Sequence, residues 1–339
     1  MNFVSELGLT RVPLTEEGRW EHNLYEAFLW GSLIGPLIGA ALVSYMGPKR
    51  ILEGGLLGAS VATLLVPAAW KTLAHFALAI AQGACTSMMW PAAHVFAARW
   101  FEPEKRSSYI SCYASWTAGW ALAAFLGATL TNSIGRDSVF YVTCLLVVCW
   151  YVAWQKYVTD LPSAPLTISW TERSLINTVT DEYSPDAPPP IVQENRFSLK
   201  AFILSGPLWA CALACFGSQW GLTTLLLAAI KYLQIVYGYS FSRDDVMSYL
   251  PFLGHFMCSI IFGCLADRFR SESYISTTTV RKLLVYTSHF LPGAIIFVFG
   301  YTGCDPSAPA ALFTAALGLI GATPAGVYTS ALEISPKYS

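Results

Sequence analysis

The sequence is a succession of long apolar segments separated by polar turns. A helix that crosses a bilayer core needs roughly 20 apolar residues. About nine segments meet or approach that length, and they cover residues 24–46, 52–70, 74–98, 109–131, 138–157, 205–236, 246–266, 283–302 and 309–332. Charged residues make up only 12% of the chain, whereas soluble domains carry about 25%. The pattern predicts an all-α polytopic membrane protein with about nine transmembrane helices.

The basic residues gather in alternate connections. The turns after the first, third, fifth and seventh segments hold most of them, including Lys49, Arg50, Arg99, Lys105, Arg106, Arg268, Arg270, Arg281 and Lys282. The opposite turns hold few, namely Lys71, Arg136, Lys231 and Arg243. Because cytoplasmic loops carry an excess of Lys and Arg, the basic turns are predicted to be cytoplasmic. The N-terminus is then predicted outside or in a lumen, and the C-terminus in the cytoplasm.

One long connection divides the predicted helices into two groups. Residues 158–204 are polar and contain the proline-rich stretch 181–190, which is typical of a linker with little packing of its own. We predict a cytoplasmic linker there, between an N-terminal bundle of five spans in residues 1–157 and a C-terminal bundle of four spans in residues 205–339.

Several classes of function are disfavoured by composition. A net charge of −1 without a basic tract argues against a nucleic-acid partner. We find no cluster of His, Asp or Glu at membrane depth, and so expect no enzymatic activity, metal or cofactor. Most of the nine cysteines lie inside apolar segments, where thiols act as small hydrophobic groups.

A series of short motifs runs through most of the chain. Its clearest members are Phe28-Leu29-Trp30-Gly31, Gln82-Gly83, Trp90-Pro91-Ala92-Ala93-His94, Arg99-Trp100, Arg106-Ser107, Gln219-Trp220-Gly221, Gly263 to Arg268, Thr278 to Lys282 and Ile334 to Tyr338. In this order and spacing they resemble the anion/cation symporters of the major facilitator superfamily. That family is solute carrier family 17, whose branches include the type I sodium–phosphate cotransporters, sialin and the vesicular glutamate and nucleotide transporters.

The resemblance implies a fold of two six-helix bundles, of which this chain lacks the first helix and the last two. It also implies secondary active transport of organic or inorganic anions, such as phosphate, sialate or glutamate, by alternating access. The implied partners are a small anionic substrate and the lipid bilayer, with a proton or sodium as a possible coupling ion. An integral, multi-pass location follows, in a plasma, vesicle or lysosome membrane; the oligomeric state is left open.

Several positions depart from the family pattern, and two of them lie in the fourth helix. Family members that move organic anions usually carry an Arg and a Glu in the fourth helix, and this sequence has Ala79 and Thr86 there. Neither can bind an anion through paired donors or carry a proton. A second hypothesis therefore stays open, in which the chain is a truncated, non-transporting membrane protein or a partner of a full-length carrier.

Two sets of candidate residues follow. The candidates for the substrate path are Tyr25, Gln82, Trp90, His94, Ser218, Trp220 and Tyr328. The alternative for this set is packing or a polar contact between helices. The candidates for a cytoplasmic gate are Lys49, Arg50, Arg106, Asp267, Arg268, Arg281 and Lys282. The alternative for this set is that its charges only set the topology. We also expect the helix containing Pro324, between Gly321 and Gly326, to be broken or flexible.

Reporter tags test the predicted topology. A tag inserted beside Lys49, Lys105 or Arg268 should report the cytoplasmic side, and one beside Lys71 or Arg136 the opposite side, because basic turns stay in the cytoplasm. Tags beside Lys49 and Lys105 that report opposite sides would contradict the assignment of the helices.

Overall fold

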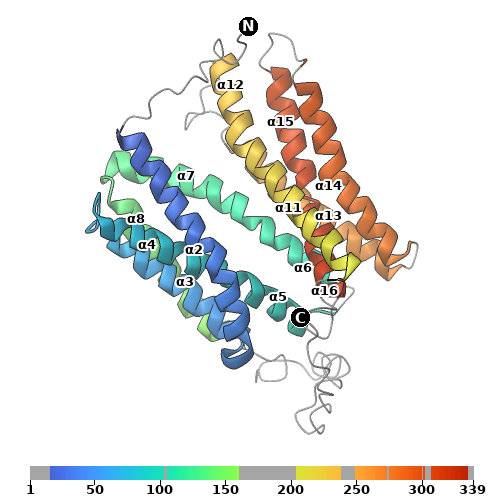
Figure 1. Cartoon of the computed structure of the whole chain (residues 1–339), viewed down its shortest axis with the longest axis horizontal. Coiled ribbons are helices and arrows are strands. Elements are labelled where there is room, and N and C mark those ends of the chain that lie inside the picture. Colours follow the sequence, from blue (N-terminus) through green and yellow to red (C-terminus); the bar gives the residue numbers. More distant parts are fainter. Residues whose placement is uncertain are drawn as a thin grey trace. The chain divides into compact units, whose positions relative to one another are not determined.

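The computed structural model describes residues 16–102, 105–159, 204–237, 249–272, 275–299, 301 and 307–334. Within these ranges the chain forms helices and short turns and no strand (Figure 1). Contacts divide the chain into two compact units: unit 1 holds residues 1–96 and 130–164, and unit 2 holds residues 97–129 and 165–339. Nearly all of the predicted linker lies outside the described residues, so the division into two bundles stays a prediction.

Unit 1 contains the N-terminal helices. They are α2 (Glu16–Met46), α3 (Pro48–Leu65), α4 (Leu73–Ser87), most of α5 (Met89–Trp100), the end of α7 (Ser115–Ser133) and α8 (Ser138–Tyr157). Between α2 and α3 the chain turns at Gly47, whose φ is 80°. Glycine adopts this left-handed conformation without a steric cost, and Pro48 then starts α3 at a position where its missing N–H does no harm. Helix α4 packs mainly against α2 and α3, and α8 packs against α3.

Small residues bring α2 and α4 into close contact. A Cβ atom on Gly83 would overlap the Phe28 carbonyl oxygen and come 2.9 Å from Ser32 N, and a Cβ atom on Gly31 would overlap the Ile80 carbonyl oxygen. Only glycine fits at such positions, and interfaces of this kind are common between membrane helices. The Gln82-Gly83 motif therefore has a packing role in unit 1.

Unit 2 contains the remaining described helices. They are α6 (Arg106–Ser111), the short 3₁₀ turn η2 (Cys112–Ala114), the first part of α7, α11 (Gly206–Thr224), the π-helical turn η4 (Leu225–Ala229), α12 (Ile230–Tyr237), α13 (Leu250–Ser271), α14 (Thr277–Phe299), α15 (Ser307–Ile320), the π-helical turn η6 (Pro324–Tyr328) and α16 (Thr329–Ile334). The largest buried cluster joins Leu222, Leu225, Phe252, Phe313 and Leu317.

One face of α13 carries small and polar residues at intervals of four. Gly263 lies so close to α6 that an added Cβ atom would come 2.7 Å from the Cβ of Ser111. One turn earlier, Ser259 Oγ donates a 3.0 Å hydrogen bond to the Ser111 carbonyl oxygen. A further turn back, His255 Nδ1 lies 3.2 Å from Thr117 Oγ1. This face holds α13 against the α6–α7 segment.

The helix boundaries differ from the predicted ones where proline or tertiary contacts intervene. The predicted span 74–98 divides at Met88 into α4 and α5, because Pro91 has no N–H to bond the carbonyl of Ser87. Helix α13 runs on to Ser271 and α14 starts at Thr277, so Asp267 and Arg281 lie in helix ends rather than in a turn. The predicted break near Pro324 is confirmed: α15 ends at Ile320 and η6 starts at Pro324.

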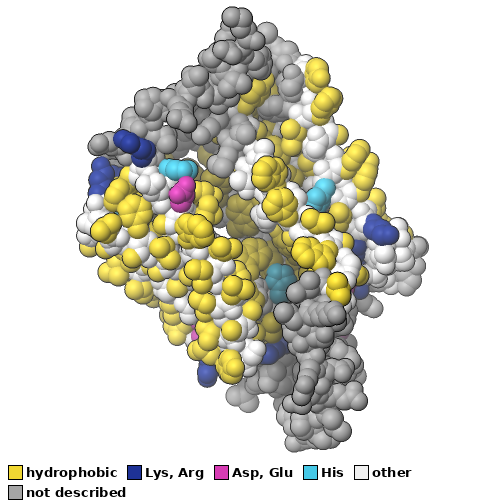
Figure 2. All heavy atoms as spheres, viewed as in Figure 1, with side chains coloured by type: hydrophobic (Ala, Val, Ile, Leu, Met, Phe, Trp, Pro, Cys, Tyr) yellow, Lys and Arg dark blue, Asp and Glu magenta, His cyan; other side chains and the backbone are white. Residues whose placement is uncertain are grey.

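Four helices in the described residues are long and apolar enough to cross a membrane: His22–Met46, Ser138–Tyr157, Leu250–Ser271 and Ser307–Ile334. Among the described residues drawn in Figure 2, hydrophobic side chains cover much of the surface, and Lys and Arg are few. Leu37, for example, is 74% exposed and Phe297 70% exposed. Apolar surface on this scale is unusual for a soluble protein and suits a lipid-facing one.

A glycine-to-alanine pair tests the α2–α4 contact. Gly83→Ala should lower the apparent Tm of the detergent-purified protein, because overpacking typically costs about 1–3 kcal/mol. Gly54→Ala is the matched control, since a Cβ atom on Gly54 in α3 meets nothing within 4 Å and alanine favours the helix by about 1 kcal/mol. Equal Tm values for the two variants would contradict the close contact.

Candidate functional site

Asp267, near the end of α13, binds the first turn of α6. Its Oδ1 accepts a 3.1 Å hydrogen bond from Ser107 N, and its Oδ2 accepts bonds of 2.8 Å from Ser108 N and 2.5 Å from Ser108 Oγ. The first N–H groups of a helix have no partner within the helix, and a carboxylate is favoured there by the helix dipole. Asp267 thus caps the segment that leads into α7.

Arg281, in the first part of α14, is a cation that is only 6% exposed. It makes a two-pronged pair with Glu333 of α16, with Nε to Oε2 at 3.1 Å and Nη2 to Oε1 at 2.8 Å. Its Nη1 donates to Ser107 Oγ at 2.9 Å and to the Ala325 carbonyl oxygen at 2.6 Å. Paired geometry of this kind is the strong form of an Arg–carboxylate interaction.

The Ala325 carbonyl is available because the helix widens at η6. The Thr329 N–H donates to the Pro324 carbonyl, five residues back, whereas a regular α-helix would direct it to Ala325. A π-helical turn of this kind leaves a carbonyl without its usual donor. Arg281 fills that role, so the broken helix and the buried cation stabilise each other.

Further arginines surround the carboxylate of Glu333. Arg270 of α13 pairs with its Oε1 at 3.0 Å. Arg106 donates to the carbonyls of Phe101 at 3.1 Å and Ala98 at 3.1 Å. Burial lowers the pKa of Arg106 from its ordinary value, the negative charge of Glu333 raises it and Arg270 lowers it. The ordinary pKa of a guanidinium is so high that Arg106 stays charged.

We call the residues Ser107, Asp267, Arg270, Arg281 and Glu333 the polar cluster. It joins five elements of unit 2: α6, α13, α14, η6 and α16. Removing one partner from a buried ion pair is strongly destabilising, because the other charge is left unpaired. The cluster therefore holds the ends of these helices together in the arrangement that the structure shows.

The other gate candidates lie outside the polar cluster, on the surface of unit 2 or in unit 1. Arg268 is exposed and pairs at 3.1 Å with Glu272, the residue that follows the end of α13. Lys282 and Arg50 are exposed. In unit 1, Lys49 Nζ lies 3.3 Å from Gln155 Oε1 and 3.6 Å from Glu53 Oε1. Of the predicted gate set, Asp267 and Arg281 meet at Ser107, and Arg106 lies beside them.

The path candidates in unit 1 make local contacts. Gln82 Nε2 donates to Thr63 Oγ1 at 2.8 Å and so links α4 to α3. His94 Nδ1 lies 2.9 Å from the Trp90 carbonyl oxygen, one turn earlier on α5. Tyr25 is exposed on α2. A role in the substrate path stays a prediction for all of them.

In unit 2, Ser218 is buried on α11 and its Oγ lies 2.8 Å from Nε2 of His289 on α14. Tyr328 accepts a 2.7 Å hydrogen bond from Gln219 Nε2, while the neighbouring Trp220 is exposed. For these candidates too a role in the path stays a prediction.

Arg270, Glu333 and His289 are not among the site residues predicted from the sequence. Glu333 was missed because the predicted last segment ended at residue 332, one position before it. A carboxylate in the last turn of an apolar helix was the available signal.

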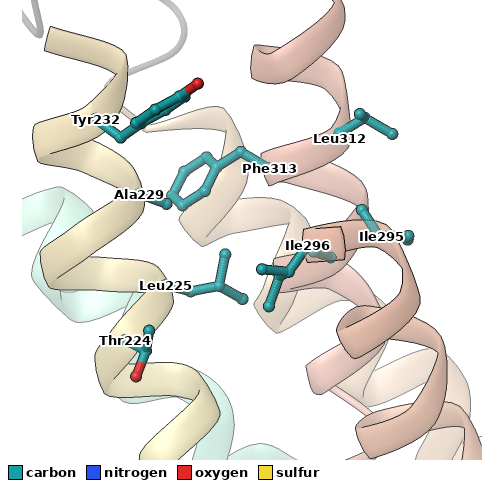
Figure 3. A pocket seen from close by; sticks show the side chains of 9 residues that line it. Thr224, Leu225, Ala229, Tyr232, Ile295, Ile296, Leu312 and Phe313 are labelled. Atoms are coloured by element: carbon teal, nitrogen blue, oxygen red, sulfur yellow. The ribbon is translucent and has the colours of Figure 1, made fainter. Parts of the chain in front are cut away.

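A pocket of about 250 Å³ lies elsewhere in unit 2, between the α11–η4–α12 helix, α14 and α15. Its lining is almost wholly apolar, and Figure 3 shows Phe313 reaching from α15 towards Leu225 and Ala229. Thr224 and Tyr232 supply the polar atoms of the lining, and no charged residue contributes. This pocket suits an apolar group rather than an anion. In the described parts of the chain, no three His, Cys, Asp or Glu side chains gather to hold a metal ion.

Comparison with models of known protein families shows the family of this chain. The family model described as Major Facilitator Superfamily matches residues 22–339. The chain belongs to the major facilitator superfamily. This confirms the predicted fold class and the predicted integral, multi-pass membrane location.

The predicted resemblance to the anion/cation symporters is confirmed by the relatives of this chain. Sialin from Homo sapiens is 27% identical over 317 residues, which are 92% of this chain and 62% of sialin. Vesicular glutamate transporter 2.1 from Danio rerio is 27% identical over 321 residues, 93% of this chain and 54% of that protein. A putative inorganic phosphate cotransporter from Drosophila melanogaster is 28% identical over 352 residues, an alignment that covers 99% of this chain and 65% of that protein. The chain thus spans just over half to about two thirds of the length of these relatives.

Two adjacent basic residues provide a matched test of the polar cluster. Arg281→Gln should lower the apparent Tm strongly, since it leaves buried acceptors unpaired at a cost of about 3–5 kcal/mol for a broken buried pair. Lys282→Gln removes the same charge from an exposed site and should change stability by no more than about 0.5 kcal/mol. Thermal unfolding in detergent measures both variants. Similar losses in the two would contradict the buried cluster.

Proposed function

We propose that this member of the superfamily is a secondary active transporter of small organic or inorganic anions that works by alternating access. The observation that carries the proposal is the polar cluster, in which Asp267, Arg281 and Glu333 tie the ends of several helices together through charge-assisted hydrogen bonds. A set of contacts that forms and breaks together is what a two-state transport cycle needs.

The polar cluster acts as a latch in this mechanism. In the latched state Asp267 holds the start of α6 and Arg281 holds η6 and α16. Release exposes these groups to water, which then solvates the separated charges and N–H groups. The two states therefore differ by contacts that largely offset one another, and a bound substrate can shift the equilibrium through its differential affinity.

The substrate class is inferred from the relatives. The names of two of them refer to glutamate and to inorganic phosphate, and both of these are anions. We propose phosphate, glutamate, sialate or a similar small anion as the substrate of this chain. Ala79 and Thr86 stand where the family usually carries an Arg and a Glu, so anion recognition and coupling here would use other residues.

Uptake into proteoliposomes tests the proposed function. The purified full chain is reconstituted, and labelled phosphate, glutamate, sialate and urate are supplied in turn under a proton or a sodium gradient. Saturable uptake of one anion, abolished by excess unlabelled anion, is the expected result. Normal insertion without uptake of any of them would overturn the proposal and favour the non-transporting alternative.

The latch is tested by neutralising Asp267. Asp267→Asn keeps the size of the side chain but removes the charge. The NH₂ group of the asparagine then lies against a backbone N–H of α6, so that two donors face each other. We expect a lower maximal rate of uptake, because charge-assisted hydrogen bonds are about twice as strong as neutral ones. Membrane insertion should be unchanged.

Arg268→Gln is the control on the next residue, which is exposed and pairs with Glu272 just beyond the end of the same helix. Its uptake rate should match that of the natural chain. Unchanged kinetics in Asp267→Asn, or an equal loss in both variants, would remove the latch from the mechanism.

A further inference from the structure

The apolar pocket of unit 2 has a buried floor and an exposed rim. Leu225 and Phe313 belong to the floor and are only 2% and 1% exposed. Ile296 of α14 and Thr224 of α11 also line the pocket and are exposed. Figure 3 shows Ile296 and Phe313 on one side and Leu225 on the other. The pocket therefore runs from the surface of unit 2 into its core.

We propose that this pocket binds an acyl chain of a bilayer phospholipid, taken from the leaflet opposite the basic turns. The proposal needs only the membrane location of the chain, which its superfamily supplies, and it does not rest on the transport function proposed above.

The lining of the pocket favours hydrocarbon over water or an anion. Apart from the hydroxyl groups of Thr224 and Tyr232, its side chains are apolar. A buried water needs about two to four polar partners, and a charge against apolar walls is strongly disfavoured. An apolar cavity of roughly 150 Å³ stays dry and takes up benzene. The pocket measures about 250 Å³, so it has room for a longer stretch of hydrocarbon.

The depth of the pocket matches one leaflet of a bilayer. Ile296 lies three residues before Phe299, where α14 ends, and Ala316 lies nine residues after Ser307, where α15 starts. At about 1.5 Å per residue these positions are about 5 Å and about 14 Å from the helix ends. One half of the hydrocarbon core measures about 15 Å. The lining thus lies within the leaflet on the predicted non-cytoplasmic side, where hydrocarbon chains are the surrounding medium.

A π-helical turn and two alanines leave this space between the helices. The turn η4 contributes Leu225 and Ala229 to the lining, and such turns widen a helix and are frequent at functional sites. Ala229 and Ala316 bring only a methyl group to the lining. The side chains around an empty space lose dispersion contacts, and packing of this kind is what holds membrane helices together. An acyl chain in the pocket restores those contacts.

Photochemical labelling tests whether a lipid chain enters the pocket. The purified full chain is reconstituted into vesicles of phosphatidylcholine that carries a diazirine in the middle of one acyl chain, then irradiated, digested and analysed by mass spectrometry. Lipid around the protein labels exposed side chains such as Phe297. A chain in the pocket also labels Leu225 and Phe313, which surrounding lipid does not reach. Labels confined to exposed side chains would overturn the proposal.

Two adjacent alanines of α15 provide matched variants for the labelling. Ala316→Phe places a ring in the pocket, whereas Ala315→Phe places the same ring at an exposed position. Labelling of Leu225 should fall to the level of a sample kept in the dark in Ala316→Phe, and it should be unchanged in Ala315→Phe. Ala229→Phe fills the pocket from the opposite wall and replaces Ala316→Phe if that variant does not fold. Undiminished labelling of Leu225 in a folded, filled variant would overturn the proposal.

Thermal unfolding in detergent gives a second readout. Added phosphatidylcholine should raise the apparent Tm of the natural chain and of Ala315→Phe, because a ligand that binds only the folded state stabilises it. The filled variant should gain less, since its pocket is already occupied. Glycerophosphocholine, which has the headgroup but no acyl chain, should give no gain. An equal gain in the filled variant, or an equal gain from glycerophosphocholine, would overturn binding of the chain in this pocket.

Discussion

The arrangement of unit 2 depends on the burial of one cation. Arg281 is almost fully buried. A buried guanidinium is tolerated only where its N–H groups meet hydrogen-bond acceptors. Glu333 supplies the countercharge, Ser107 a hydroxyl, and Ala325 a carbonyl that the π-helical turn leaves available. These acceptors come from three different elements, so the position of Arg281 fixes where α6, η6 and α16 meet α14.

The two units bring their helices together in different ways. In unit 1, glycines at positions 31 and 83 let α2 and α4 approach backbone to backbone. In unit 2, the face of α13 that carries Ser259 and Gly263 combines hydrogen bonds with a close approach to α6. Between membrane helices the surrounding lipid is as apolar as the side chains, so close packing and hydrogen bonds hold the helices together rather than a hydrophobic effect.

Helix α14 links the two polar regions of unit 2. Arg281 and His289 are two turns apart, about 12 Å along the axis at 1.5 Å per residue. Arg281 binds α6, η6 and α16, whereas His289 binds α11. A shift of α14 along or about its axis would disturb both sets of hydrogen bonds together. The polar cluster and the contacts of His289 are therefore linked through one rigid element.

The membrane-spanning, all-helical class follows from the sequence alone, because several apolar runs long enough to cross a bilayer, with few charges between them, are typical of membrane helices. It also located Asp267 and Arg281, since charges at the ends of apolar segments stand out, and it indicated the break at Pro324. Their partners become visible in the folded chain. Ser107, Ala325 and Glu333 are far from Arg281 in the chain, and His289 reads as one more polar residue in an apolar helix until Ala214 and Ser218 lie against it. Hydrogen-bond partners across helices depend on packing, which no local pattern in the sequence encodes.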